Sequence, residues 1–104
     1  MELQKFGERL AKLRAQKNVS ARKMSLFIGV SANYINKIEN GKTFPSMHAF
    51  FEICEYLEIS PKDFFDDGND QPVMVKEMVG DYVRLDSTSQ SNIAEIVKEL
   101  ARDN

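Results

Sequence analysis

The stretch GVSANYINKIENGK, residues 29–42, decides the fold, because it places a short helix between two glycines. Glycine adopts the left-handed backbone that ends helices more easily than any other residue. Gly29 is therefore expected to end the helix over 21–28, and Gly41 to follow the end of a helix over 32–39. Ser31, just before the second helix, is a residue type that caps helix N-termini.

The helix over 32–39 has two different faces. At about 100° per residue, Ile35 and Ile38 lie on one side, which predicts that this side is buried. The opposite face consists of Ala32, Asn33, Asn36, Lys37 and Asn40, and Tyr34 lies on its flank. This face therefore carries amides and one cation but no acid. Asparagine matches the donor and acceptor of an adenine edge, and lysine suits guanine or a phosphate. The face indicates a probe for base edges, with an ordinary solvated surface as the alternative.

The net charge of −2 is unevenly distributed. Residues 1–44 contain nine Lys and Arg against three Glu, a net charge of +6, whereas residues 45–104 carry −8. The first part can face a polyanion, which favours nucleic acid as a partner. Two solvated surfaces of opposite sign would explain the same numbers.

Apolar spacing predicts helices along most of the chain, so the fold class is all-α. The first runs over about 3–17, and Ser20 can cap the next. A fourth helix is expected to bury a stripe of Met47, Phe50, Ile53, Cys54 and Leu57. Ser60 and Pro61 open a short fifth helix. The aromatic residues around these two helices are expected in the core: Phe44, Phe50, Phe51, Tyr56, Phe64 and Phe65.

The segment DDGNDQP, residues 66–72, has the composition of a linker. Two more helices follow it, and Asp86 or Ser87 can cap the second. That last helix has an apolar stripe of Ile93, Ile96, Val97 and Leu100. The sequence thus predicts five helices in residues 1–68 and a two-helix extension in residues 69–104.

Several functions are disfavoured by composition. One cysteine, Cys54, excludes an internal disulfide, and one histidine, His48, makes a dedicated metal cage improbable. No apolar run approaches the roughly 20 residues of a membrane span. No nucleophile is placed against a base, so we expect neither an enzyme nor a cofactor. The simplest location is the reducing cytoplasm.

The order of residues over about 3–65 resembles the Cro/C1-type helix-turn-helix family, also called the xenobiotic-response-element-like family. The positions that match are Ser20, Met24, Ser25, Gly29-Val30-Ser31, Ile35, Ile38 to Lys42, Pro45-Ser46 and LEISPKDFF at 57–65. The resemblance implies a sequence-specific regulator of transcription, a repressor, that binds double-stranded DNA. It makes the helix over 32–39 the recognition helix.

The resemblance also implies residue roles. Bases would be read by Ala32, Asn33, Tyr34, Asn36 and Lys37. Phosphates would be bound by Ser20, Ala21, Arg22, Asn40, Lys42 and Thr43. A structural ion pair would join Arg14 to Glu39 and fix the recognition helix against the first helix.

The sequence departs from the family pattern in three places. Ala21 stands where the family often has glutamine, and Leu26 and Phe27 occupy positions that are usually polar. Residues 69–104 lie outside the pattern. Their stripe, Ile93, Ile96, Val97 and Leu100, is expected to form a homodimer, which would place two recognition helices about 34 Å apart. Packing on its own domain is the alternative.

A second possible function is an antitoxin-type protein that binds a partner protein, such as a toxin or another regulator, and represses its own promoter.

Overall fold

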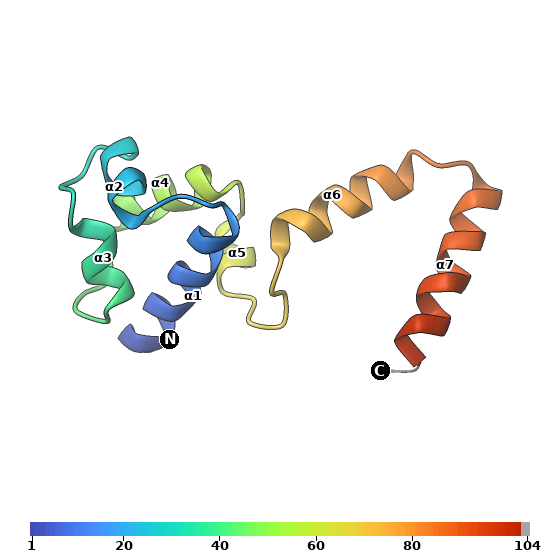
Figure 1. Ribbon diagram of the computed structural model, residues 1–104, viewed down its shortest axis with the longest axis horizontal. Helices are drawn as coiled ribbons and strands as arrows, with labels where there is room; N and C mark the ends of the chain where they lie inside the picture. Colours follow the sequence, from blue (N-terminus) through green and yellow to red (C-terminus); the bar gives the residue numbers. More distant parts are fainter. Residues whose placement is uncertain (103–104) are drawn as a thin grey trace. The chain divides into compact units, whose positions relative to one another are not determined.

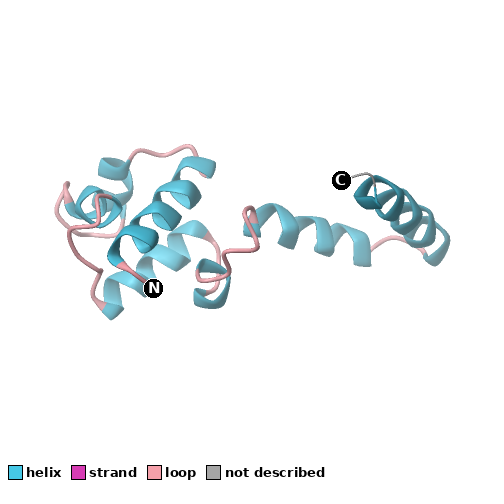
Figure 2. Cartoon of the chain, turned by 90° about the horizontal axis from the view of Figure 1, so that it is seen from below, coloured by secondary structure: helices cyan, strands magenta, loops and turns pink. Residues whose placement is uncertain are grey.

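The computed structural model describes residues 1–102, and within that range all regular secondary structure is helical (Figure 2). This confirms the predicted all-α class. The chain divides into two compact units, Met1–Pro72 and Val73–Asn104. Residues 69 and 70 bond to the first helix and so belong with the first unit. No helix in the described part of the chain is long and apolar enough to span a bilayer.

The first three helices are α1 (Leu3–Gln16), α2 (Ala21–Phe27) and α3 (Tyr34–Glu39) (Figure 1). The Ser20 side chain caps α2 by accepting from the Lys23 N–H at 3.0 Å, as predicted. Gly29, with φ of +83°, follows the end of α2, and Gly41, with φ of +72°, follows the end of α3. Both ends therefore use the left-handed glycine that the sequence indicates.

The expected start of the third helix is two residues too early. Its N-cap is Asn33, which has helical φ and ψ of −95° and 0° and makes no side-chain cap bond. The residue before it, Ala32, lies in a turn that the Tyr34 N–H closes by donating to the Ser31 carbonyl at 3.0 Å. Ser31 thus contributes its backbone and not the side-chain cap that was predicted.

Two more helices, α4 (Met47–Leu57) and α5 (Pro61–Phe64), complete the first unit. The side chains of Ser46 and Ser60 cap them. The core that the five helices enclose contains Phe6, Leu10, Leu13, Met24, Ile35, Ile38, Ala49, Phe50, Ile53, Cys54, Leu57, Ile59 and Phe64. α3 contributes only its two isoleucines, so the rest of that helix is left for the surface.

Part of the predicted core is wrong. Met47 is 68% exposed, although it was placed in the buried stripe of the fourth helix. Phe44, Phe51 and Phe65 are each about half exposed, whereas Phe50 and Phe64 are buried as expected. The edges of the apolar face of α4 therefore remain in solvent.

The second unit consists of most of α6 (Pro72–Val83) and of α7 (Ser87–Arg102). Asp86 caps α7 by accepting from the Ser89 N–H at 2.8 Å, and this bond holds the pKa of the Asp86 carboxyl below its ordinary value. The predicted stripe of α7 is exposed along its length: Ile93, Ile96, Val97 and Leu100. The unit therefore has helices but no buried core of its own among the described residues.

Candidate DNA interface

α3 presents a polar surface of the kind predicted. Ile35 and Ile38 have no exposed area, whereas Asn36 and Lys37 are exposed. Asn33, one residue before the helix, is also exposed, and Ala32 is half-buried. Amides and a lysine thus face solvent while the isoleucines anchor the helix. A short helix held in this way can enter a groove without losing its own packing.

The position of α3 relative to α2 depends on a buried hydroxyl. The Ser25 side chain has no exposed area; it donates to the Ala21 carbonyl at 2.8 Å and accepts from the Ile35 N–H at 3.1 Å. Ile35 lies in the first turn of α3, where backbone N–H groups lack partners within the helix. Ser25 therefore joins the two helices by a bond that alanine could not make. The sequence matched Ser25 to the family pattern but did not predict this bond.

α3 also approaches α1 closely, as Figure 1 shows for the two helices. A Cβ atom on Gly7 would lie 2.5 Å from the Ile38 carbonyl oxygen and 2.7 Å from that of Glu39. Only glycine leaves room for that backbone. Sequence reasoning missed Gly7, because a glycine inside a helical pattern is not distinguished by spacing alone.

Arg14 and Glu39 connect the same two helices. The Arg14 Nε lies 2.6 Å from Glu39 Oε2 and its Nη2 lies 2.9 Å from Oε1, while Nη1 donates to the Val19 carbonyl at 2.7 Å. The hydrogen bond to Glu39 raises the pKa of the Arg14 guanidinium. Both side chains are largely shielded, with 21% and 10% of their areas exposed. The fork geometry orients α3 as well as neutralising the charges.

Tyr34 is fixed by a contact that the sequence did not predict. Its hydroxyl accepts a hydrogen bond from the Ser46 N–H at 3.1 Å, and Ser46 is the residue that caps α4. The ring therefore connects the start of α3 with the start of α4. Of the residues predicted to read bases, Tyr34 and Ala32 are half-buried, and Asn33, Asn36 and Lys37 are exposed.

The predicted phosphate ligands lie at two ends of the helix-turn-helix. Ser20, Ala21 and Arg22 begin α2. Asn40, Lys42 and Thr43 follow α3, where the Lys42 N–H donates to the Lys37 carbonyl and closes the turn. The side chains of Arg22, Asn40, Lys42 and Thr43 are exposed, and Ala21 is half-buried.

Four cations of the basic first half are already engaged. Arg9 is buried and donates to the carbonyls of Phe64, Asp63 and Asn69 at 2.8–3.0 Å, so it holds α5 and the following loop against α1. Lys12 pairs with Asp70 at 2.7 Å, Lys17 with Glu58 at 3.7 Å, and Arg14 with Glu39. Among residues 1–102, the other five cations of the first half form no ion pair: Lys5, Arg22, Lys23, Lys37 and Lys42. Four of these five lie in α2, in α3 or in the loop after α3.

No group of three or more His, Cys, Asp or Glu that could hold a metal ion occurs among the described residues. Cys54 is buried in α4, and burial raises the pKa of its thiol to about 11. The position of Cys54 in the core is as predicted.

Comparisons with known proteins agree with this geometry. The family model described as a helix-turn-helix domain matches residues 7–68. Among solved structures, the restriction-modification controller protein C.AhdI from Aeromonas hydrophila is similar, with a TM-score of 0.57 and 30% sequence identity. The similarity covers 61% of this chain and 91% of that chain. A search among curated proteins finds no match.

These findings define the class of protein: it is a sequence-specific DNA-binding regulator of transcription. The chain belongs to the helix-turn-helix domain family, of the Cro/C1 type that the residue pattern resembles. The family match ends at residue 68 and so leaves α6 and α7 outside it.

Proposed function

We propose that this regulator reads its operator by inserting α3 into the major groove. The observation that carries the proposal is the exposure of Asn33, Asn36 and Lys37 on a helix fixed from behind by Ser25, Gly7 and the Arg14–Glu39 pair. Asn36 and Asn33 would pair with adenine edges and Lys37 with guanine or phosphate. Ala32 would let the helix approach closely, and Tyr34 would lie at the edge of the groove.

Phosphate contacts would set the orientation. Ser20, Ala21 and Arg22 lie at the start of α2, and Asn40, Lys42 and Thr43 lie just after α3, so the two groups flank the proposed reading surface in the chain. Exposed Arg22, Lys37 and Lys42 supply the positive charge that a polyanion requires. Because phosphate binding releases condensed counterions, affinity for the operator should fall steeply as salt rises.

We further propose that the protein binds as a homodimer through residues 69–104. The second unit has a hollow of about 650 Å³ between α6 and α7, lined by apolar side chains that include Met78, Val79, Tyr82, Leu85, Ile93 and Val97. Residues 73–104 are fewer than the roughly 40 below which a chain seldom folds unaided. A second copy would bury this surface, together with Ile96 and Leu100, in a bundle of four helices.

Repression is the simplest mode of action, because a dimer bound over a promoter blocks other proteins from it. The name of C.AhdI describes a controller of restriction and modification, which makes genes of that kind a candidate target for this chain as well. Neither comparison supports the antitoxin alternative specifically.

Selection of bound duplexes from a random pool tests the proposal. The full chain should enrich an inverted repeat whose half-sites lie about one helical turn apart, since each half of a dimer reads one half-site. A pool without any enriched sequence would refute base reading. A single enriched half-site without a repeat would refute the dimeric mode while leaving base reading intact.

A further inference from the structure

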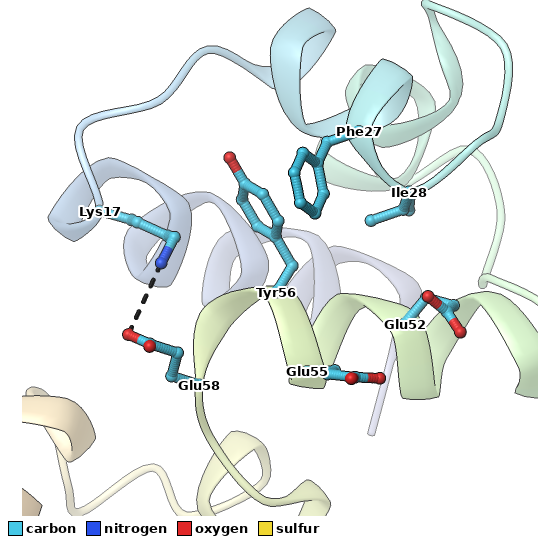
Figure 3. A pocket seen from close by; sticks show the side chains of 7 residues that line it. All are labelled: Lys17, Phe27, Ile28, Glu52, Glu55, Tyr56 and Glu58. Atoms are coloured by element: carbon cyan, nitrogen blue, oxygen red, sulfur yellow. Dashed lines mark ion pairs between the residues drawn. The ribbon is translucent and has the colours of Figure 1, made fainter.

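A second surface of the first unit has a chemistry opposite to that of the DNA interface. A hollow of about 460 Å³ lies between the end of α1, the end of α2 and one side of α4, and Figure 3 shows the side chains that line it. Its lining includes Lys17, Phe27, Tyr56 and the carboxylates of Glu52, Glu55 and Glu58. None of these residues belongs to α3 or to the loop that follows it.

Phe27 contributes almost nothing to the core. It is 73% exposed, and its neighbour Leu26 is 55% exposed, at the end of the helix that precedes the recognition helix. The Phe27 ring lies against Tyr56 with the ring centroids 4.7 Å apart, as Figure 3 shows. The two rings form one wall of the hollow, with an apolar face left in water. Adjacent exposed apolar side chains beside a hollow are typical of an interaction site.

Acidic side chains also line the hollow. Glu52, Glu55 and Glu58 extend along one side of α4 and its C-terminal end, opposed by the single ammonium of Lys17 (Figure 3). This charge repels nucleic acid and attracts a cation. Lys17 shows that the site accepts one: its Nζ lies 5.2 Å from the centre of the Tyr56 ring and 3.7 Å from a Glu58 oxygen. A cation between an aromatic face and carboxylates is favoured by both.

We propose that this surface, lined by Phe27, Tyr56, Glu52, Glu55 and Glu58, binds a short basic segment of another protein. An arginine or lysine of that segment enters between Tyr56 and the glutamates, and an apolar side chain of the segment covers Phe27. Because the surface shares no residue with the proposed base-reading and phosphate-binding sets, the partner binds while the regulator is on DNA. The site therefore gives the regulator a protein contact independent of its operator contact.

Selection of binders from a phage-displayed library of random 12-residue peptides tests the proposal on the full chain. Peptides selected by the unsubstituted protein should be rich in Arg or Lys and contain an apolar residue. A labelled peptide from that pool should bind roughly tenfold more weakly to Glu55→Lys and to Phe27→Ser. Glu95→Lys, the same charge change on exposed α7, is the matched control and should bind as the unsubstituted protein does.

Lys17 provides a test with the opposite sign. Lys17→Ala removes the resident ammonium and should strengthen peptide binding several-fold, whereas Lys62→Ala, the same charge change on α5, should change it less. The proposal would be overturned if the peptides selected by the unsubstituted protein were no more basic than those selected by Glu55→Lys. Loss of the dimer in Phe27→Ser, measured by light scattering, would also overturn it, because a second copy would then be the occupant. Operator binding by Glu55→Lys reports separately on the DNA interface and should be retained.

Discussion

Ser25 joins α2 to α3 through the hydrogen bond that its hydroxyl accepts from the Ile35 N–H. Ser25→Ala would leave the Ile35 N–H without its 3.1 Å acceptor in a fully buried position. An unsatisfied buried donor costs about 1–3 kcal/mol, so the free energy of unfolding should fall by that amount. Chemical denaturation measures it. Ser31→Ala, at an exposed serine of the same turn, should change stability by less than about 0.5 kcal/mol, and equal effects of the two variants would contradict the role of Ser25.

Cys54 should behave as a buried core residue. Its pKa of about 11 in the folded protein exceeds the ordinary thiol value of about 8.5, so the folded thiol stays protonated at pH 8. Labelling by a thiol reagent at that pH should be slow in the native protein and fast in denaturant. By linkage, the thiol's contribution to stability is complete below pH of about 8.5 and is lost as the pH rises towards 11. Rapid native labelling with a midpoint near 8.5 would show an exposed thiol.

The sequence predicted the polar face of the recognition helix because amphipathic spacing is a local property. Ile35, Ile38 and the two terminal glycines are all within one short stretch. The role of Arg9 was not predictable in this way. It looked like one more cation of a basic half, but its acceptors, the carbonyls of Asp63, Phe64 and Asn69, lie 54–60 residues further along the chain. Only the folded chain brings them together.

At the scale of elements, the contact between α1 and α3 should be the least tolerant of an added side-chain atom. Alanine usually stabilises a helix interior relative to glycine by about 0.5–1 kcal/mol. Gly7→Ala should nevertheless destabilise the protein by about 1–3 kcal/mol, because the added Cβ meets the carbonyls of Ile38 and Glu39. Operator affinity should fall too, since α3 must shift.

Gly80→Ala is the matched control for Gly7→Ala. Gly80 also lies inside a helix, α6, but a Cβ there would have nothing within 4 Å. Thermal unfolding should show Gly80→Ala to be neutral or stabilising. If Gly7→Ala were equally stabilising, the close approach of α1 and α3 would not exist in solution.

Helix positions were predicted better than the extent of burial. The serine caps and left-handed glycines act through neighbouring residues, so they can be read from spacing. Burial of Met47, Phe44 and Phe51 depends on how much of α4 and the preceding loop other helices cover, which spacing does not determine. The predicted start of α3 was wrong for a related reason. Asn33 has a helical backbone that continues the turn before it, where the prediction expected a cap by the Ser31 side chain.

At the scale of the whole molecule, we expect assembly to depend on α7. Leu100→Asp introduces a charge into the exposed apolar stripe and should convert a dimer to a monomer, because an unpaired carboxylate would be buried in the interface. Light scattering gives the mass. Ser91→Asp, at about 160° from Ile93 on the helix, adds the same charge away from the stripe and should remain dimeric.

The result that would contradict this expectation is a Leu100→Asp protein of unchanged mass. A chain truncated after Pro72 is the second check, because residues 69 and 70 must be kept for Arg9 and Lys12 to retain their partners. It should be folded and monomeric.

The central claim is that α3 reads bases while the loop after it binds phosphate. The most direct measurement is the base preference of Asn36→Ala and of Lys42→Ala, each determined by selecting duplexes from a random pool. Asn36→Ala should relax the preference at one position of each half-site, at a cost of about 1–3 kcal/mol, whereas Lys42→Ala should weaken all sequences about equally. An unaltered base preference in Asn36→Ala would contradict the account.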